Sequence, residues 1–204
     1  MQELNGKVAV ITGGASGMGR AFAGRFAAEG MRIAIADIEE PVLDQAVAEL
    51  EAAGAEVLGM RCDVSDHGSV RDFGTAVEEA FGTAHVVCLN AGVASGGLIA
   101  AQSLKPWQWV LRVNLFATVH VLDVFLPRLI EQAAGHLVMT ASLAGHTSIA
   151  GPAPYHPPTH APVTLPHPSH PPPPPAPPPA RPRPPWLAQS PHIRRICVAN
   201  SFVV

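Results

Sequence analysis

The sequence predicts an α/β fold in which helices cover both faces of a parallel sheet. Short apolar runs typical of buried strands alternate with amphipathic helical segments from Lys7 to Thr140. Glycines at helix-terminating positions, Gly30, Gly54 and Gly82, separate helices from the strands that follow. With 204 residues, 48% of them hydrophobic, the chain can form one domain with a sizeable core.

Five apolar runs are expected to be strands, because each is short, rich in branched residues and bounded by turn residues. They are Val8–Thr12, Arg32–Ala36, Val57–Asp63, His85–Leu89 and His136–Ala141. Such alternation of strands and helices indicates a parallel sheet.

Four helices are expected between these strands. Pro41 suits the first turn of the second helix, Ser65 or Asp66 can cap the third, and the fourth is expected to run from Asn114 to Gln132. The residues expected to face inward on the first three helices are Met18, Phe22, Phe26, Leu43, Val47, Leu50, Val70, Phe73, Val77 and Phe81.

A glycine-rich segment, Thr12-Gly-Gly-Ala-Ser-Gly-Met-Gly19, joins the first strand to the first helix. Gly13, Gly17 and Gly19 allow the backbone to turn sharply and to approach a pyrophosphate. The helix that follows offers free N–H groups and its positive end. Such a loop can also be an ordinary turn, but the flanking strand and helix favour dinucleotide binding.

Asp37 ends the second strand, 18 residues after Gly19. A carboxylate at this place can accept hydrogen bonds from both adenosine-ribose hydroxyls and would repel a 2′-phosphate. Neither Ala15 nor Ile38 supplies a cation that would bind that phosphate. The sequence therefore favours NAD(H) over NADP(H); the alternative is that Asp37 is only a solvated turn residue.

The TGxxxGxG spacing resembles that of the short-chain dehydrogenase/reductase family, whose fold is a Rossmann-type, doubly wound parallel sheet. Three further motifs follow in the family's order: Cys62-Asp63-Val64, Asn90-Ala91-Gly92 and Val113-Asn114-Leu115. The resemblance implies that Asp63 bonds the adenine amino group. Leu89 stands where the family often has a second Asn, so one sheet-stabilising contact is expected to be missing.

The loop and the resemblance together predict the residues of the cofactor site. They are Thr12, Gly13, Ser16, Gly17, Met18, Gly19, Asp37, Asp63, Val64, Asn90, Ala91 and Gly92.

Ser142 and Tyr155 lie 13 residues apart, as the family's catalytic Ser and Tyr do. The resemblance implies hydride transfer between nicotinamide and an alcohol or ketone. In that reaction Tyr155 is the acid/base, Ser142 donates to the substrate oxygen, and Asn114 holds a water in the proton path. Taken singly, each has an equally good structural explanation: Ser142 is a hydroxyl at the end of a strand, Asn114 a helix cap and Tyr155 a buried aromatic residue.

The chain departs from the family directly after Tyr155. Thr159 occupies the position of the family's Lys, which lowers the Tyr pKa, and Pro157 and Pro158 interrupt the expected helix. Single-base changes to cytosine convert Ala, Ser and Lys codons into these three residues, which indicates a degraded read or a decayed gene after Tyr155. Because the Lys is missing and the helix is interrupted, we expect impaired turnover. The alternative is a catalytically dead nucleotide-binding pseudoenzyme whose proline-rich tail docks on SH3-like partners.

Composition divides the chain into three regions. Residues 1–155 are expected to form the NAD-binding domain, 156–191 a proline-rich irregular segment, and 192–204 a remnant strand. The segment from 157 to 191 holds 17 of the 22 prolines, which favours polyproline II or disorder over helix. The C-terminal part of the fold is thus expected to be incomplete or disordered.

Charge and cysteine content limit the partners. All 16 acidic residues precede Tyr155, so residues 1–155 carry 9 − 16 = −7 and give no reason to expect nucleic acid. Three widely spaced cysteines form neither a disulfide framework nor a zinc pattern, and we expect no metal site. With no signal-peptide pattern and no membrane span recognised, a cytoplasmic enzyme acting on a small molecule is expected. The family is usually homo-oligomeric.

Overall fold

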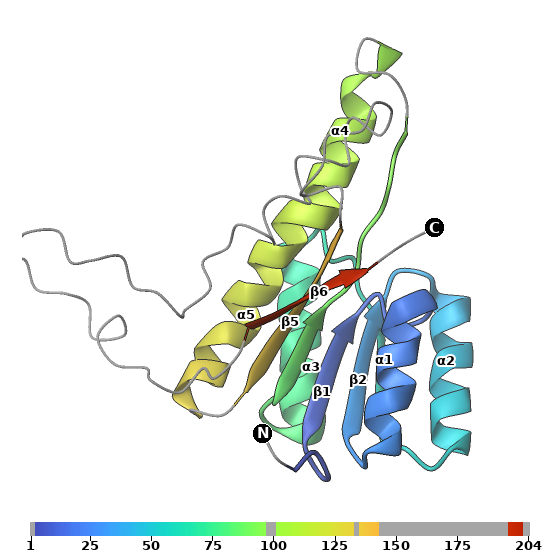
Figure 1. The fold of residues 1–204 in the computed structure, drawn as a ribbon, viewed down its shortest axis with the longest axis vertical. Coiled ribbons are helices and arrows are strands. Elements are labelled where there is room, and N and C mark those ends of the chain that lie inside the picture. Colours follow the sequence, from blue (N-terminus) through green and yellow to red (C-terminus); the bar gives the residue numbers. More distant parts are fainter. Residues whose placement is uncertain (1–2, 97–100, 133–134, 143–195, 202–204) are drawn as a thin grey trace, which may run out of the picture.

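The computed structural model describes residues 3–96, 101–132, 135–142 and 196–201. A parallel sheet of six strands forms its centre, in the order β3-β2-β1-β4-β5-β6 (Figure 1). The strands are β1 Val8–Thr12, β2 Arg32–Asp37, β3 Val57–Arg61, β4 Val86–Leu89, β5 His136–Ser142 and β6 Ile196–Ser201. This order is that of a doubly wound Rossmann-type sheet, so the predicted fold class is confirmed.

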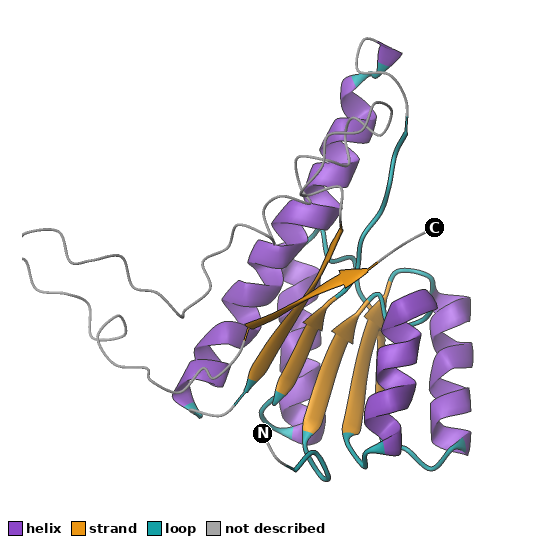
Figure 2. Ribbon diagram, viewed as in Figure 1, coloured by secondary structure: helices purple, strands orange, loops and turns teal. Residues whose placement is uncertain are grey.

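The helices lie on the two faces of this sheet (Figure 2). They are α1 Gly17–Ala28, α2 Glu40–Ala52, α3 His67–Phe81, α4 Leu104–Leu111, the π-helical turn Arg112–Phe116 and α5 Ala117–Glu131. Helices α1 and α2 cover one face, and α3 and α5 cover the other. Each βα unit thereby brings the end of a strand and the start of a helix to the same edge of the sheet.

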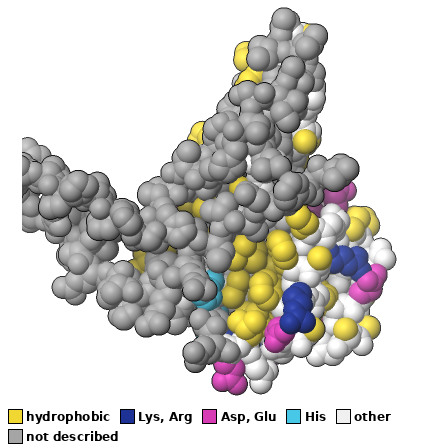
Figure 3. Space-filling view, viewed as in Figure 1, with side chains coloured by type: hydrophobic (Ala, Val, Ile, Leu, Met, Phe, Trp, Pro, Cys, Tyr) yellow, Lys and Arg dark blue, Asp and Glu magenta, His cyan; other side chains and the backbone are white. Residues whose placement is uncertain are grey.

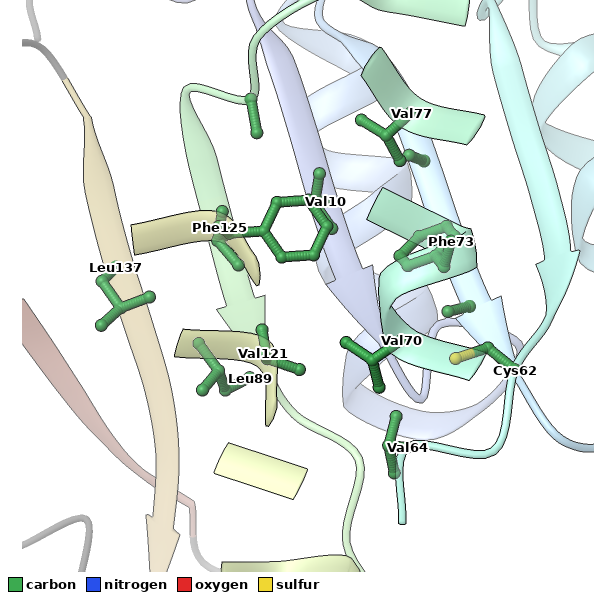
Figure 4. Packing of buried hydrophobic residues seen from close by; sticks show 14 of the residues in the cluster. Val10, Cys62, Val64, Val70, Phe73, Val77, Leu89, Val121, Phe125 and Leu137 are labelled. Atoms are coloured by element: carbon green, nitrogen blue, oxygen red, sulfur yellow. The ribbon is translucent and has the colours of Figure 1, made fainter. Parts of the chain in front are cut away.

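Alternation along the strands produces two cores. Val8 and Val10 of β1 face α3 and α5, whereas Ala9 and Ile11 face α1 and α2. In the first core, Phe73 of α3 meets Phe125 of α5 edge to face, with ring centroids 6.2 Å apart (Figure 4). Hydrophobic burial on both faces explains why the strands read as nearly continuous apolar runs.

Charged side chains gather on the outer helices. Arg20 of α1 pairs with Glu49 of α2, and Arg25 pairs with Glu29 at the end of α1. In the space-filling view, charged side chains of both signs lie over the α1 and α2 side, while hydrophobic side chains gather beside them (Figure 3). Exposed pairs of this kind contribute little to stability, so packing against the sheet holds the helices.

The expectations for α3 are confirmed. Asp66 caps the helix by accepting a 3.0 Å hydrogen bond from the Gly68 N–H, and Gly82 ends the helix with a φ of 75°. The four residues expected to face inward are all buried: Val70, Phe73, Val77 and Phe81.

For α1 the expectation was partly wrong. Met18 is 36% exposed, and the fully buried positions of the helix are Gly19 and Ala23. Phe22 and Phe26 pack against the core as expected. Met18 differs because it lies in the first turn, which extends beyond the sheet edge.

The helix predicted from Asn114 begins ten residues earlier, at Leu104, so that boundary was wrong. Pro106 falls in the first turn, where the missing N–H has no helical partner to lose. The whole helix from Leu104 to Glu131 is long and apolar enough, by length and composition, to cross a membrane. Its inner face, with Val121 and Phe125, nevertheless packs against the sheet and α3, as a core helix does.

Of the C-terminal regions, β6 falls within 192–204 and pairs in parallel with β5. The proline-rich segment 156–191 lies outside the described residues, so the three-part division of the chain stays a prediction.

We predict that Phe73→Ala lowers the free energy of unfolding by about 3–5 kcal/mol, because it removes a fully buried ring and leaves a cavity. Phe116→Ala is the matched control: that ring is 50% exposed, and its loss is expected to cost less than about 1 kcal/mol. Urea denaturation of the full chain measures both. Equal losses would contradict the assignment of the core.

Candidate cofactor-binding site

A cavity of about 600 Å³ lies at the carboxyl edge of the sheet, where the loops after β1, β2, β3 and β4 converge. Ten of the twelve predicted cofactor residues line it. They are Gly13, Ser16, Gly17, Met18, Asp37, Asp63, Val64, Asn90, Ala91 and Gly92. Thr12 and Gly19 do not line the cavity and instead support its walls. Carboxyl ends of parallel strands are the usual place for ligands in such sheets.

Thr12 and Asn90 join the ends of β1 and β4. The Thr12 hydroxyl donates to the Cys88 carbonyl at 3.4 Å and accepts from the N–H groups of Asn90 and Ala91 at 3.1 and 3.2 Å. The Asn90 side-chain amide donates to the carbonyls of Thr12 and Gly13 at 3.2 and 3.1 Å. These bonds hold the glycine-rich loop against the loop after β4.

The same amide also reaches β5, because its oxygen accepts from the Thr140 hydroxyl at 3.2 Å. Asn90 therefore uses both ends of its side chain to connect three adjacent strands. Leu89, which replaces the family's second Asn, is buried in the first core instead.

The glycines of the first loop are required by close packing. Gly13 has a φ of 64°, and a Cβ there would lie 2.9 Å from the Ala91 Cα. A Cβ on Gly19 would lie 2.0 Å from the Gly13 carbonyl oxygen, so α1 can approach the loop only with glycine at this position. Gly17, with a φ of 52°, turns the chain into the helix.

The Asp37 carboxylate is fixed by backbone donors. One oxygen accepts from the Ala15 N–H at 3.0 Å, and the other accepts from the N–H groups of Ile38 and Glu39 at 2.8 and 3.3 Å. Because a carboxylate has about four acceptor sites, roughly one is left, on the oxygen that bonds Ala15. The carboxylate thus links the glycine-rich loop to β2 and retains less acceptor capacity than two ribose hydroxyls would use.

The loop after β3 forms the next wall of the cavity. One Asp63 carboxylate oxygen accepts from the Ser65 N–H at 2.9 Å, and the Asp63 N–H donates to the Ser69 hydroxyl at 3.1 Å. Cys62 is buried beside them, and burial is the main cause that raises the pKa of its thiol. The thiol is therefore held neutral at ordinary pH.

Sequence reasoning missed several residues that line the cavity. They are Ala36, Ile38, Glu39, Cys62, Ser65, Val93, Trp109 and Val113. Trp109 lies in α4 and Val113 in the π-helical turn, and both precede Asn114, where the sequence predicted the helix to begin. The earlier start of that helix is the reason they were missed.

Asn114 lies in the π-helical turn between α4 and α5. Its side-chain oxygen accepts from the Val93 N–H, and its side-chain NH₂ donates to the Val93 carbonyl, both at 2.8 Å. This reciprocal pair fixes the chain directly after Gly92. Single π-helical turns occur often at functional sites, and this one presents Asn114 to the loop that borders the cavity.

Ser142 is the last residue of β5 and so lies at the same sheet edge as Thr12 and Asp37. The predicted acid/base Tyr155, and Thr159 at the position of the family's Lys, lie outside the described residues. Within the part of the chain that is described, no group of three His, Cys, Asp or Glu side chains could hold a metal ion.

Comparison with known proteins supplies independent information. A model of the short chain dehydrogenase family matches residues 7–161. The 2,5-dichloro-2,5-cyclohexadiene-1,4-diol dehydrogenase LinX of Sphingobium indicum is 38% identical over 152 residues, which are 74% of this chain and 61% of LinX. The 1-deoxy-11-beta-hydroxypentalenate dehydrogenase of Streptomyces avermitilis is 38% identical over 161 residues, 78% of this chain and 60% of that protein.

A solved structure agrees with the sequence relatives. A short-chain dehydrogenase/reductase from Burkholderia phymatum, crystallised in complex with NAD, superposes with a TM-score of 0.79 at 45% identity. The match covers 81% of this chain and 59% of that one. The chain therefore spans about three fifths of the length of the curated relatives it matches.

We predict that Gly19→Ala destabilises the protein by about 1–3 kcal/mol and weakens NADH binding at least about tenfold, because the new Cβ meets the Gly13 carbonyl. Gly24→Ala, in the same helix with nothing within 4 Å of its Cβ, is expected to stabilise by about 0.5–1 kcal/mol. Thermal unfolding and NADH titration distinguish the two. If Gly19→Ala behaves like Gly24→Ala, the close approach of α1 to the loop is not required.

Proposed function

The chain belongs to the short-chain dehydrogenase family, and from this premise we propose that it is an NAD-dependent oxidoreductase that interconverts an alcohol and a ketone. The observation that carries the proposal is the cavity between the glycine-rich loop and Asp37. It lies at the sheet edge where doubly wound folds bind dinucleotides. The substrate is a small molecule, and we place the enzyme in the cytoplasm.

The residues of the loop fit a dinucleotide. Ser16 is the N-cap of α1 and makes no side-chain capping bond, so the hydroxyl and the first N–H groups of the helix can serve a ligand. The positive end of the helix suits a pyrophosphate. The absence of a Cβ on Gly13 and Gly19 lets the start of α1, the glycine-rich loop and the loop after β4 pack closely around this helix end. When bound, the nicotinamide cofactor supplies or accepts the hydride.

Asp37 supports NAD(H) rather than NADP(H). Its carboxylate lines the cavity and is held in place by three backbone N–H groups, so it cannot swing away from a 2′-phosphate. The oxygen that bonds Ala15 can accept from one ribose hydroxyl. The Burkholderia phymatum relative was crystallised in complex with NAD, which supports binding of a nicotinamide dinucleotide.

We assign the proton chemistry to Tyr155, Ser142 and Asn114. Tyr155 exchanges a proton with the substrate oxygen, Ser142 donates a hydrogen bond to that oxygen, and Asn114 holds a water in the proton path. The position of Ser142 at the carboxyl edge of β5 supports its role. The Asn114 pair with Val93 supports a fixed orientation of that side chain.

Thr159 favours a second candidate function. Without the family's Lys, the chain retains the cofactor site but has lost the charge that lowers the Tyr155 pKa. In this reading it senses NAD(H) without turnover, and the proline-rich tail binds a partner with SH3-like grooves. Measurable turnover excludes this second candidate function. Binding of NADH without turnover favours it.

We predict that the full chain binds NADH more tightly than NADPH. Asp37→Ala is expected to reduce the ratio of the two affinities, the cofactor gap, by about tenfold or more, because the fixed carboxylate no longer repels the 2′-phosphate. Glu40→Gln removes an acid of the adjacent helix that does not line the cavity, and it serves as the control. Calorimetric titration with both cofactors measures the gap. A wild-type chain with no preference would refute the role of Asp37.

We also predict that the unmodified chain turns over substrate poorly. Loss of a nearby cation raises the pKa of a Tyr by about 1–3, so less of it is the reactive tyrosinate. Thr159→Lys alone is expected to recover little, since Pro157 and Pro158 still break the helix. The triple change Pro157→Ala, Pro158→Ser and Thr159→Lys is expected to raise NAD-dependent oxidation of secondary alcohols about tenfold or more. Robust turnover by the unmodified chain would show that the Lys is dispensable.

A further inference from the structure

The loop between β3 and α3 sets one side of the candidate cofactor cavity. Four consecutive residues of it, from Cys62 to Ser65, line that cavity. The internal bonds from Ser65 to Asp63 and from Asp63 to Ser69 fix the shape of the loop. They do not fix where the loop lies relative to the remainder of the site.

Helix α5 makes one contact to this loop and a second to the first residue of α3. His120 Nδ1 lies 3.0 Å from the Val64 carbonyl oxygen. One turn later in the helix, Asp123 pairs with His67, the first residue of α3, with 2.9 Å between carboxylate oxygen and Nε2. The two imidazole rings are in contact in a tilted arrangement, with centroids 5.4 Å apart and an interplanar angle of 51°. The His pair and Asp123 thus form a continuous contact between α5 and the start of α3.

The His120 contact is the better shielded of the two. Val64 is 7% exposed and belongs to the first core, whereas His67 and Asp123 have exposed side chains. A carbonyl only accepts hydrogen bonds, so His120 must be the donor through Nδ1–H. A buried carbonyl that loses its donor must find water or move, and the loop would move with it.

We infer that His120 is a positioning residue for the adenosine side of the cofactor, acting through the Val64 carbonyl on the loop that carries Asp63. The inference rests on the proposed function, since it assumes that the cavity holds a dinucleotide. Asn114, about two turns earlier in the same continuous helix, bonds Val93, which also lines the cavity. One helix therefore holds two of the segments that line the cavity.

Replacement of His120 separates its hydrogen bond from its bulk. His120→Leu keeps the bulk but has no donor, whereas His120→Asn places an amide NH₂ near the position of Nδ1. Titration of the full chain with ADP-ribose is expected to give an affinity about fivefold weaker for His120→Leu, and within about twofold of wild type for His120→Asn. Val119→Ala, an exposed neighbour on α5, is expected to leave the affinity unchanged.

Equal affinities of wild type and His120→Leu, or equal losses in the Leu and Asn variants, would overturn the inference. If His120→Leu does not fold, comparison of His120→Asn with His120→Gln decides. The Gln amide lies one methylene further out and is expected to bind ADP-ribose more weakly than the Asn variant. Equal affinities of the Asn and Gln variants would count against a positioned donor.

Hydrogen exchange of the ligand-free chains separates this inference from the proposed function. His120→Leu is expected to speed exchange in the peptide that covers Cys62–Ser69, while β1 exchanges as in wild type. Unchanged exchange in that peptide overturns the role of His120 even if the cofactor binds. Failure of the wild type to bind ADP-ribose, with faster loop exchange in the variant, refutes the proposed function alone.

Discussion

The hydrogen bonds between Thr12 and Asn90 are the constraint on which the site depends. A single buried hydroxyl and a single side-chain amide bring together the end of β1, the glycine-rich loop and the start of the loop after β4. These two loops both line the cavity, so this junction fixes the part of the site that would hold the pyrophosphate. Asp37 extends it to β2 through the Ala15 N–H.

This arrangement explains why residues of the same glycine-rich motif have different roles. Thr12 and Gly19 do not touch the cavity: one ties strands together, and the other permits α1 to approach. Ser16, Gly17 and Met18 project at the helix end and are available to a ligand. Supporting residues and contacting residues share one motif because a dinucleotide requires both a tight turn and exposed N–H groups.

Sequence reasoning recovered the fold and most of the cavity because both follow from local patterns. Strand alternation, the Asp66 cap and the glycines are each encoded within a few residues. Other features depend on contacts between distant segments, such as Trp109 in the cavity wall and the bond from His120 to Val64, 56 residues away. Periodicity also placed Met18 inward, since it cannot tell where a helix passes the edge of the sheet.

The proposed role of the cavity at the carboxyl edge is to hold a nicotinamide dinucleotide. Trp109 lines that cavity, so bound NADH should accept excitation energy from tryptophan. Titration of the full chain with NADH, followed by this energy transfer, is the most direct test. We expect the signal to saturate at about one NADH per chain and to be reversed by ADP-ribose. A signal that does not saturate, or that ADP-ribose leaves unchanged, would contradict it.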